Sequence, residues 1–338
     1  MNAIQIAALA PAAVRAAARL RWAREAVGDD ALELEPASAD AGFRSYWRAA
    51  TAAGSRIVMD SPPALEDVRP WLRVHALLRG AGVRVPGILA EDVDAGFLLL
   101  EDLGADTCLQ AMEREGADAL FEAAFDQLLA LQAIECPPDL PRYDRAMLQR
   151  ELDLFAEWFL GRHLGVSLDA REREALQGVC DFLVANMLAQ PQVLVHRDFM
   201  PRNLMPVPGG VAVIDFQGAV RGPLAYDPIS LFRDAFHSWP PQTVGAWLDR
   251  YHARASAAGL PVPARDEFRR DADCAGMQRH LKILGLFARL HYRDGKPKYL
   301  ADAPRFVAYV GQVLPQYPEL APLAAILDRH LPRPGAET

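Results

Sequence analysis

The first third of the chain alternates between short apolar runs and polar or turn-forming residues. Between residues 31 and 104 the runs are ALELE, FRSYWRAA, SRIVMD, GILAEDV and GFLLLE, and Gly or Pro separates most of them. Runs of this length and composition are typical of strands. One helical periodicity, over residues 66–80, interrupts them. The pattern predicts a small strand-rich N-terminal lobe over residues 1–103, made of an amphipathic helix that begins near Pro11 and an antiparallel sheet.

After residue 103 the apolar positions recur at helical spacing. The predicted helices cover residues 106–135, 144–161, 169–189, 264–293, 303–313 and 318–330. Residues 104–338 are therefore expected to form a large helical C-terminal lobe. A small strand-rich lobe followed by a large helical one is a bilobal α+β architecture.

One strand-rich island lies inside the helical half, over residues 193–216. VLVH is followed by a loop, and NLMPVPGGVAVID then predicts a hairpin that turns at Gly209 and Gly210. The second strand of this hairpin is apolar enough to be buried on both faces. Asn203 and Asp215, at the two ends of the hairpin, are expected to converge in space.

The polar residues of this island follow the order that phosphoryl transfer requires. His196, Asp198 and Asn203 stand as H-x-D-x-x-x-x-N. Asp198 suits the base that accepts the proton of an attacking hydroxyl, while Asn203 and Asp215 suit ligands of Mg²⁺. His196 would support the catalytic loop by hydrogen bonds. The alternative is a strand end capped by solvated polar residues, but the joint fit of strands, loop length and ligand types favours the kinase-like interpretation.

Composition and charge narrow the possible partners. The chain has a net charge of -8, which disfavours nucleic acid as a partner but still allows a local basic pocket for a small anion. Its 4 cysteines include no C-x-x-C pair, which argues against a disulfide framework and a zinc site. No apolar run reaches the ~18 residues of a membrane span. We expect a cytoplasmic monomer that acts on a small molecule.

The island also resembles a known family. HRDFMPRN followed by IDFQGA is similar to the catalytic and metal-binding motifs of the aminoglycoside phosphotransferase family, which are small-molecule kinases with a protein-kinase-like fold. The resemblance implies ATP and Mg²⁺ as cofactors, with residues 1–103 as the nucleotide-binding lobe. It also implies that FLLLEDLG, residues 97–104, is the hinge between the lobes, where backbone groups from Glu101 to Leu103 would hydrogen-bond the adenine ring. The alternative for this stretch is an ordinary edge strand and turn.

The chain departs from the kinase pattern where a strand lysine usually holds the α and β phosphates. In RIVMDSPP that position is occupied by Met59 or Asp60, and no lysine precedes Lys282. A guanidinium group can grip phosphate oxygens in a bidentate manner, so an arginine could substitute. The candidates are Arg44, Arg48 and Arg56. For each of them the alternative is a solvent-facing arginine.

Two loops carry further candidates. The loop around Gly42, Phe43 and Arg44 could cover the nucleotide phosphates with its backbone amides. In the catalytic loop, Arg202 could neutralise charge on the transferred phosphoryl group or on an anionic acceptor, with a salt bridge to a nearby acid as the alternative. The resemblance assigns Asp227, in YDP, to the support of the catalytic loop.

Four stretches resemble a narrower group within the family, the bacterial kinases that phosphorylate the C1 hydroxyl of N-acetylmuramate and N-acetylglucosamine for peptidoglycan recycling. They are AGFRSYWR, IVMDSPP, VHRDFMPRNLM with IDFQGAVRGPLAYDP, and QRHLKILGLFARL followed by YRDGKPKYL. Together they sample most of the chain. This resemblance implies an amino sugar as the acceptor.

A polar stripe on the predicted helix 264–293 is one candidate for the acceptor pocket. Its members recur at four, three and four residues and so share one face: Gln278, Lys282, Gly285 and Arg289. A cationic stripe would suit the carboxylate of N-acetylmuramate, although a solvated surface is the more common arrangement.

A second candidate is ELDLFAEW, residues 151–158, which places Glu151 and Trp158 seven residues apart on one helical face. A carboxylate that binds hydroxyls and a ring that packs on a pyranose often occur together in sugar sites. The alternative is a core tryptophan beside a surface glutamate.

Two other functions stay open from the sequence. The same fold could phosphorylate another small alcohol, such as an aminoglycoside or an amino alcohol. The missing lysine also allows a nucleotide-binding pseudokinase, but the retention of Asp198, Asn203 and Asp215 argues against it.

Overall fold

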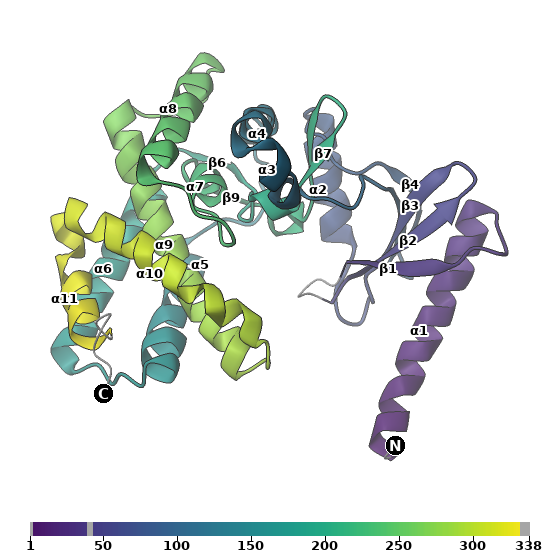
Figure 1. Cartoon of the computed structure of the whole chain (residues 1–338), viewed down its shortest axis with the longest axis horizontal. Coiled ribbons are helices and arrows are strands. Elements are labelled where there is room, and N and C mark those ends of the chain that lie inside the picture. Colours follow the sequence, from purple (N-terminus) through teal and green to yellow (C-terminus); the bar gives the residue numbers. More distant parts are fainter. Residues whose placement is uncertain (1–2, 39–42, 332–338) are drawn as a thin grey trace. The chain divides into compact units, whose positions relative to one another are not determined.

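The computed structural model describes residues 3–38 and 43–331 (Figure 1). The chain divides into two compact units. Unit 1 comprises Met1–Gln127 and Arg202–Gln217, and unit 2 comprises Leu128–Pro201 and Gly218–Thr338. The division passes through one helix and through the predicted catalytic loop, whereas the lobe boundary predicted from the sequence follows residue 103. That boundary stays a prediction. The predicted α+β class, with a small antiparallel sheet and a large helical part, is confirmed.

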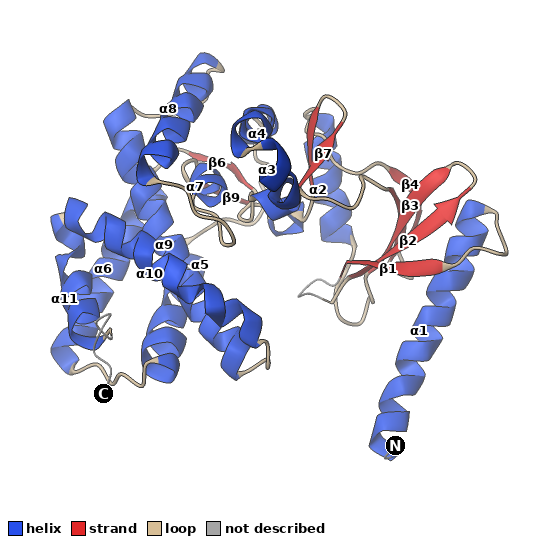
Figure 2. Cartoon of the chain, in the orientation of Figure 1, coloured by secondary structure: helices blue, strands red, loops and turns tan. Residues whose placement is uncertain are grey.

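Unit 1 contains a five-stranded antiparallel sheet in the order β1-β2-β3-β5-β4 (Figure 2). Its strands are β1 (Leu34–Ser38), β2 (Ser45–Thr51), β3 (Gly54–Asp60), β4 (Ile88–Asp92) and β5 (Phe97–Glu101). Helix α1 (Ala3–Val27) packs on one face, where Ala23 joins Val58 and Leu99 in a buried apolar cluster. Alternate strand residues point to opposite faces, so one face of the sheet is buried by α1.

The strands predicted in this unit are confirmed, with β1 displaced by a few residues toward the C-terminus. The predicted helix start near Pro11 is wrong, because α1 begins at Ala3. The helix extends before Pro11 because alanine, which recurs there, has a high helix propensity.

The rest of unit 1 consists of helices and one hairpin. These elements are α2 (Arg69–Gly80), α3 (Cys108–Glu115), most of α4 (Ala117–Gln132), β7 (Leu204–Val207), β8 (Gly210–Val213) and the 3₁₀ turns Pro201–Asn203 and Phe216–Gly218 at the unit boundaries. The ring of Trp71 on α2 lies 4.9 Å from the ring of the buried Phe216. Helix α2 is thus packed against the segment that follows the hairpin.

Unit 2 is built around α9 (Arg265–Tyr292). The other elements are α5 (Arg145–Leu154), a π-helix (Phe155–His163), α6 (Ala170–Ala189), β6 (Gln192–Val195), β9 (Val220–Pro223), α7 (Tyr226–Phe232), α8 (Pro241–Ala257), the 3₁₀ segments Pro297–Asp302, Leu314–Gln316 and Pro318–Leu320, α10 (Ala303–Val313) and α11 (Ala321–His330). Helix α9 contacts α5, α6, α7, α8, α10 and the π-helix, so both its polar and its apolar residues are buried (Figure 1).

Several predicted elements differ from the structure. The predicted helix 106–135 is broken at Gly116, which takes a positive φ of 78° that favours glycine. The predicted strand VLVH is present as β6, and it pairs with β9, a strand that was not predicted because its Gly and Pro carry no strand signal. Helices α7 and α8 were also not predicted, since α7 is short and α8 starts at Pro241 after a Pro-rich stretch.

Within the described ranges, no helix is both long and apolar enough to cross a membrane.

Candidate active site

In unit 1 the hairpin brings Asn203 and Asp215 together, as the sequence predicted. Leu204 pairs with Val213 at the open end, and the backbone N–H of Ile214 donates to the carbonyl of Asn203 at 3.0 Å. The second strand is buried, as expected. Asp215 takes a left-handed backbone conformation with φ of 62°, a strained geometry that often marks functional positions. Both side chains offer oxygen atoms at one end of one hairpin.

Arg44 lies against the carboxylate of Asp215. Its guanidinium is 3.6 Å from Asp215 and 3.5 Å from Glu66, and the residue is only 9% exposed. Its Nε atom is buried and has no hydrogen-bond partner in the described part of the chain. Because these two ion pairs are longer than good hydrogen bonds, the guanidinium keeps donor capacity for another ligand. Glu66 was not singled out from the sequence; a carboxylate shortly before the helix that follows β3 is the signal that could have found it.

In this protein, the strand position that carries a lysine in most kinases is occupied by buried or paired side chains that cannot reach a nucleotide. Met59 is fully buried, and the buried carboxylate of Asp60 is paired with Arg15 at 2.7 Å and with Arg19 at 2.9 Å. Both arginines come from α1, and the Arg19 guanidinium also lies 3.7 Å from the centre of the Trp47 ring. The ion pairs of Asp60 therefore hold α1 against the sheet.

The other arginine candidates are engaged elsewhere. Arg48 donates to Asp102 at 2.6 Å and to the carbonyl of Gly104 at 2.9 Å. Arg56 donates to the carbonyls of Ser55 and Ala53 within its own hairpin. Among the three candidates, Arg44 is the one that the structure brings to Asp215.

The remaining predicted nucleotide contacts lie in two segments of unit 1. Gly42 falls outside the described residues, and Phe43 is 63% exposed. The Glu101 carboxylate binds Arg84 at 2.5 Å, and this hydrogen bond holds the pKa of Glu101 below its ordinary value. Leu103 is partly exposed. The predicted adenine contact through the backbone of Glu101 to Leu103 stays a prediction.

In unit 2, Asp227 anchors the first part of the predicted catalytic loop. Its carboxylate accepts the backbone N–H of His196 at 2.6 Å and that of Arg197 at 3.0 Å. Burial raises the pKa of Asp227 to about 7, although the two N–H donors oppose this shift. The backbone N–H of Asp198 in turn donates to Nδ1 of the buried His196 at 3.3 Å. Supporting roles for Asp227 and His196 agree with this geometry.

The predicted acceptor residue Glu151 lies in a buried polar cluster of unit 2. Its carboxylate accepts hydrogen bonds from Tyr143 and from Gln278 at 3.0 Å, and it pairs with Arg197 at 2.6 Å and with Lys282 at 3.1 Å. Burial alone raises the pKa of Glu151, but Lys282, Arg197 and the two hydrogen bonds outweigh it, so the pKa lies below the ordinary value. The carboxylate is thus held ionised.

Tyr226 extends this cluster. The Tyr143 hydroxyl lies 3.3 Å from the Tyr226 hydroxyl, to which Lys282 also donates at 3.4 Å. Burial tends to lower the pKa of Lys282, but Tyr226 and Glu151 raise it above its ordinary value. The two tyrosines and Arg197 carry no signal in the sequence, because nothing in the local pattern places residues 143, 197 and 226 together.

The polar stripe of α9 is not a solvated surface. Gln278 is fully buried, and an added Cβ at Gly285 would lie 2.2 Å from the carbonyl carbon of Leu154. Arg289 is partly buried, and its Nε atom has no hydrogen-bond partner within the described ranges. The stripe instead forms the contact of α9 with α5 and the π-helix.

The backbone contact at Gly285 coincides with the change from α-helix to π-helix after Leu154. A π-helix has wider turns than an α-helix. The seven-residue spacing between Glu151 and Trp158 therefore does not place them on a common α-helical face, and this part of the prediction is wrong. Trp158 is partly buried on the π-helix. A sugar contact by either residue stays a prediction, as does the role proposed for Arg202.

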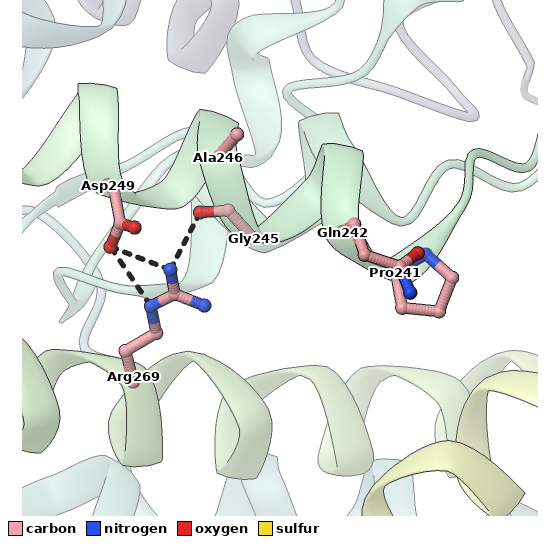
Figure 3. A pocket seen from close by; sticks show the side chains of 6 residues that line it. All are labelled: Pro241, Gln242, Gly245, Ala246, Asp249 and Arg269. Carbon is pink, nitrogen blue, oxygen red and sulfur yellow. Dashed lines mark hydrogen bonds and ion pairs between the residues drawn. The ribbon is translucent and has the colours of Figure 1, made fainter.

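A separate groove of about 480 Å³ is lined by residues at the start of α8 and by Arg269 of α9 (Figure 3). Arg269 bridges it by binding Asp249 at 2.6 Å and the carbonyl of Gly245 at 2.8 Å. The remaining lining residues are Pro241, Gln242 and Ala246. Its charged groups satisfy one another, and it includes none of the residues expected to act on substrate.

Asn203 and Asp215 fit the chemistry of a magnesium site. Amide and carboxylate oxygens are hard donors that Mg²⁺ prefers, and nucleotide-bound Mg²⁺ takes only one or two protein carboxylates. Among residues 3–38 and 43–331, no group of three or more His, Cys, Asp or Glu side chains could hold a metal ion.

Comparison with known proteins gives consistent matches. The model of the phosphotransferase enzyme family matches residues 33–269. The chain is 50% identical over 306 residues to an N-acetylmuramate/N-acetylglucosamine kinase of Pseudomonas aeruginosa, covering 90% of each chain. Among solved structures, an ethanolamine kinase from Plasmodium vivax aligns with a TM-score of 0.62 at 12% identity, covering 86% of each chain. An ADP-bound aminoglycoside phosphotransferase aligns with a TM-score of 0.60 at 13% identity, over 88% of this chain and 98% of the other. At these identities the two structures show the fold alone.

Proposed function

We propose that this chain, which belongs to the phosphotransferase enzyme family, is an ATP-dependent kinase that phosphorylates the C1 hydroxyl of N-acetylmuramate and N-acetylglucosamine. The observation that carries the proposal is the likeness to the Pseudomonas aeruginosa kinase along 90% of both chains. The residues that the reaction needs, Asp198, Asn203 and Asp215, are all present in the expected order. The sugar 1-phosphates would serve peptidoglycan recycling.

Asp198 is the proposed catalytic base. It would orient the C1 hydroxyl and accept its proton while the oxygen forms a bond to the γ-phosphorus of ATP and the bond to the ADP oxygen breaks. An anomeric hydroxyl is more acidic than other sugar hydroxyls, so a carboxylate can accept its proton late in the transition state. The anchoring of His196 and Arg197 by Asp227 supports this role, because it fixes the backbone just before Asp198.

Asn203 and Asp215 would hold Mg²⁺ through their side-chain oxygens. When bound, the ion neutralises charge on the phosphate oxygens. The hairpin that brings the two residues together supports this assignment. Gln217 donates to Asp215 at 2.7 Å, which orients one carboxylate oxygen.

Arg44 is the proposed substitute for the missing strand lysine. Its ion pair with Glu66 corresponds chemically to the lysine–glutamate pair of other kinases, and it lies against Asp215, the proposed metal ligand. Arg48 and Arg56, which are occupied by other partners, have less support for this role. An arginine in this position also weakens the argument for a pseudokinase, since that argument depended on the absence of a lysine.

The test is an ADP-release assay with N-acetylmuramate, N-acetylglucosamine, glucose, ethanolamine and kanamycin as acceptors. We expect turnover on the first two sugars, with an acid-labile product as for a sugar 1-phosphate. Asp198→Asn should lower kcat by about 10²–10⁴-fold. Turnover with only ethanolamine or kanamycin would show that the acceptor is an amino alcohol or an aminoglycoside. ATP binding without turnover on any acceptor would favour the pseudokinase. Full activity of Asp198→Asn contradicts the proposed mechanism.

A further inference from the structure

We propose that Glu151 is a positioning residue for Asp198 that acts through Arg197, rather than a residue that binds the sugar. This inference rests on the role of Asp198 proposed above. In this proposal the buried polar cluster of unit 2, which surrounds Glu151, holds the backbone of the proposed catalytic loop in place.

The first argument concerns the backbone of Arg197. Its φ of 75° lies in the left-handed region, which costs a non-glycine residue free energy and persists only where surrounding contacts enforce it. Three contacts do so here. The backbone N–H binds Asp227, the guanidinium pairs with Glu151 at 2.6 Å, and the same guanidinium lies 5.4 Å from the centre of the Tyr143 ring. Because Asp198 is the next residue, its direction depends on this conformation.

The second argument is the occupancy of the Glu151 carboxylate. An ionised carboxylate offers about four acceptor positions. Arg197 and Lys282 pair with Oε1, while Tyr143 and Gln278 donate to Oε2. Four protein donors therefore occupy all the acceptor positions of the Glu151 carboxylate. A sugar hydroxyl could bind only by displacing one of them.

The third argument is how Glu151 is held in place. It lies on α5, one turn before the junction where Gly285 of α9 touches the backbone of Leu154. Lys282 and Gln278, on the same helix α9, bind the carboxylate directly. Two helices thus fix the position of one carboxylate, which in turn fixes Arg197. Such a connected set of restraints is what precise orientation of a catalytic group requires.

Charge explains why the carboxylate itself is needed. Glu151 pairs with two cations, Arg197 and Lys282, whose side chains are 20% and 13% exposed, and its removal takes the paired carboxylate away from both of them. Unpaired buried charges are costly and rearrange. The guanidinium of Arg197 would then seek another partner, and the residue would be free to leave its left-handed conformation.

The experiment measures kcat and KM of Glu151→Gln with both N-acetylmuramate and N-acetylglucosamine. Displacement of a catalytic group by about 1 Å can lower the rate by about 100-fold. We expect kcat to fall by about 10- to 100-fold, by the same factor for both sugars, with KM for each sugar changed by less than about threefold. The matched control is Glu157→Gln, which removes an exposed carboxylate from the adjoining π-helix and should leave both constants unchanged.

A double-mutant cycle tests whether the effect passes through Arg197. In an Arg197→Ala background, Glu151→Gln should lower kcat by less than about twofold further, because residues that act as a unit are not additive. Additive losses would overturn the proposed route. A rise in KM for the sugar with kcat unchanged would instead make Glu151 a sugar-binding residue, and unchanged constants would also contradict the proposal.

If Glu151→Gln does not fold, as judged by its thermal unfolding, Arg197→Lys gives a second test. It keeps a cation beside Glu151 but loses the planar guanidinium, so kcat should fall for both sugars with KM little changed. Wild-type kcat in a folded Arg197→Lys protein would overturn the inference. Failure of the function itself is distinguishable, since in that case the wild-type chain would not phosphorylate either sugar.

Discussion

Two clusters of arginine and carboxylate groups differ in how completely they are closed. In unit 1, Arg44 lies 3.5 Å from Glu66 and 3.6 Å from Asp215, whose side chains are 29% and 30% exposed. In unit 2, Arg197 lies 2.6 Å from Glu151, whose side chain is only 11% exposed and is bound by three further donors. We call Arg44, Glu66 and Asp215 the open cluster, because Arg44 keeps donors for another ligand. We call Glu151 and its four donors the closed cluster, because all acceptor positions of Glu151 are used.

The difference indicates different tasks. Long ion pairs around an accessible carboxylate leave room for a metal ion and phosphates, which would tighten the cluster when they bind. Short ion pairs in a buried cluster with every acceptor position used hold a fixed geometry. We therefore expect substitutions in the open cluster to change nucleotide and metal binding, and substitutions in the closed cluster to change orientation or stability.

The largest expected effect is at the carboxylate of the open cluster. Asp215→Asn keeps the side-chain size and tolerates the left-handed backbone, so the loss reports on charge alone. We expect kcat/KM to fall by about 1,000-fold, since the variant loses the anionic ligand that would hold Mg²⁺. A steady-state assay over a range of Mg²⁺ concentrations measures this. Asp94→Asn, whose carboxylate is 93% exposed in the same unit, is the control and should behave as wild type.

Arg44→Gln should raise KM for ATP. A hydrogen bond to a charged group contributes about 1.5–3 kcal/mol, which corresponds to about 10- to 100-fold in affinity. Arg44→Lys should recover part of this loss, because the cation remains while the bidentate geometry is lost. Isothermal titration with a non-hydrolysable ATP analogue measures the change independently of turnover.

The control for Arg44 is Arg69→Gln, an exposed arginine that pairs with Asp67 and Asp94. If Arg48→Gln or Arg56→Gln weakens nucleotide binding more than Arg44→Gln does, the assignment of the phosphate-gripping residue is wrong.

The packing of α9 against α5, which holds the closed cluster together, can be disturbed at Gly285. Gly285→Ala would place a Cβ 2.2 Å from the Leu154 carbonyl carbon, so α9 and α5 must separate. Overpacking of this kind costs about 1–3 kcal/mol of the free energy of unfolding. In the control Gly178→Ala, the new Cβ meets nothing within 4 Å in the middle of α6, so the variant should gain about 0.5–1 kcal/mol. Urea unfolding monitored by circular dichroism compares them, and equal stabilities would contradict the close contact.

The smallest effect is a pH dependence of stability that comes from Glu151. Its folded-state pKa lies below the ordinary value of 4.5, so its stabilising contribution is fully present above pH 4.5 and is lost as the pH falls through the folded pKa. The difference in free energy of unfolding between wild type and Glu151→Gln should be constant from pH 7 to pH 5 and should shrink below pH 4.5. Urea titrations at several pH values measure it. A difference independent of pH would mean that Glu151 is not held ionised by the cluster.

The comparison of the two clusters also shows where prediction from the sequence succeeded. Asn203 and Asp215 end the two strands of one hairpin, so the local pattern was enough to predict that they meet. The assignment of Asp198 as the base comes from the same motif and stays a prediction. The strands of the small sheet were found for the same reason, as their period and their turns lie within a few residues.

The closed cluster could not be predicted in this way. Glu151, Arg197 and Lys282 come from three elements far apart in the chain, and each was interpreted from its own helix or loop. The π-helix after Leu154 changes the number of residues per turn, so Glu151 and Trp158 do not share the helical face that their spacing predicted. This π-helix begins where Gly285 of α9 lies close to the backbone of Leu154. Long-range packing of this kind leaves little trace in a local pattern.

The sequence by itself determined the architecture, the order of the catalytic loop and the types of the proposed metal ligands, because periodicity and motif spacing are local. The tertiary structure decided which arginine lies beside Asp215 and which carboxylate holds Arg197. Those pairings depend on charged groups that burial brings together, and a buried ion requires a partner wherever in the chain that partner originates.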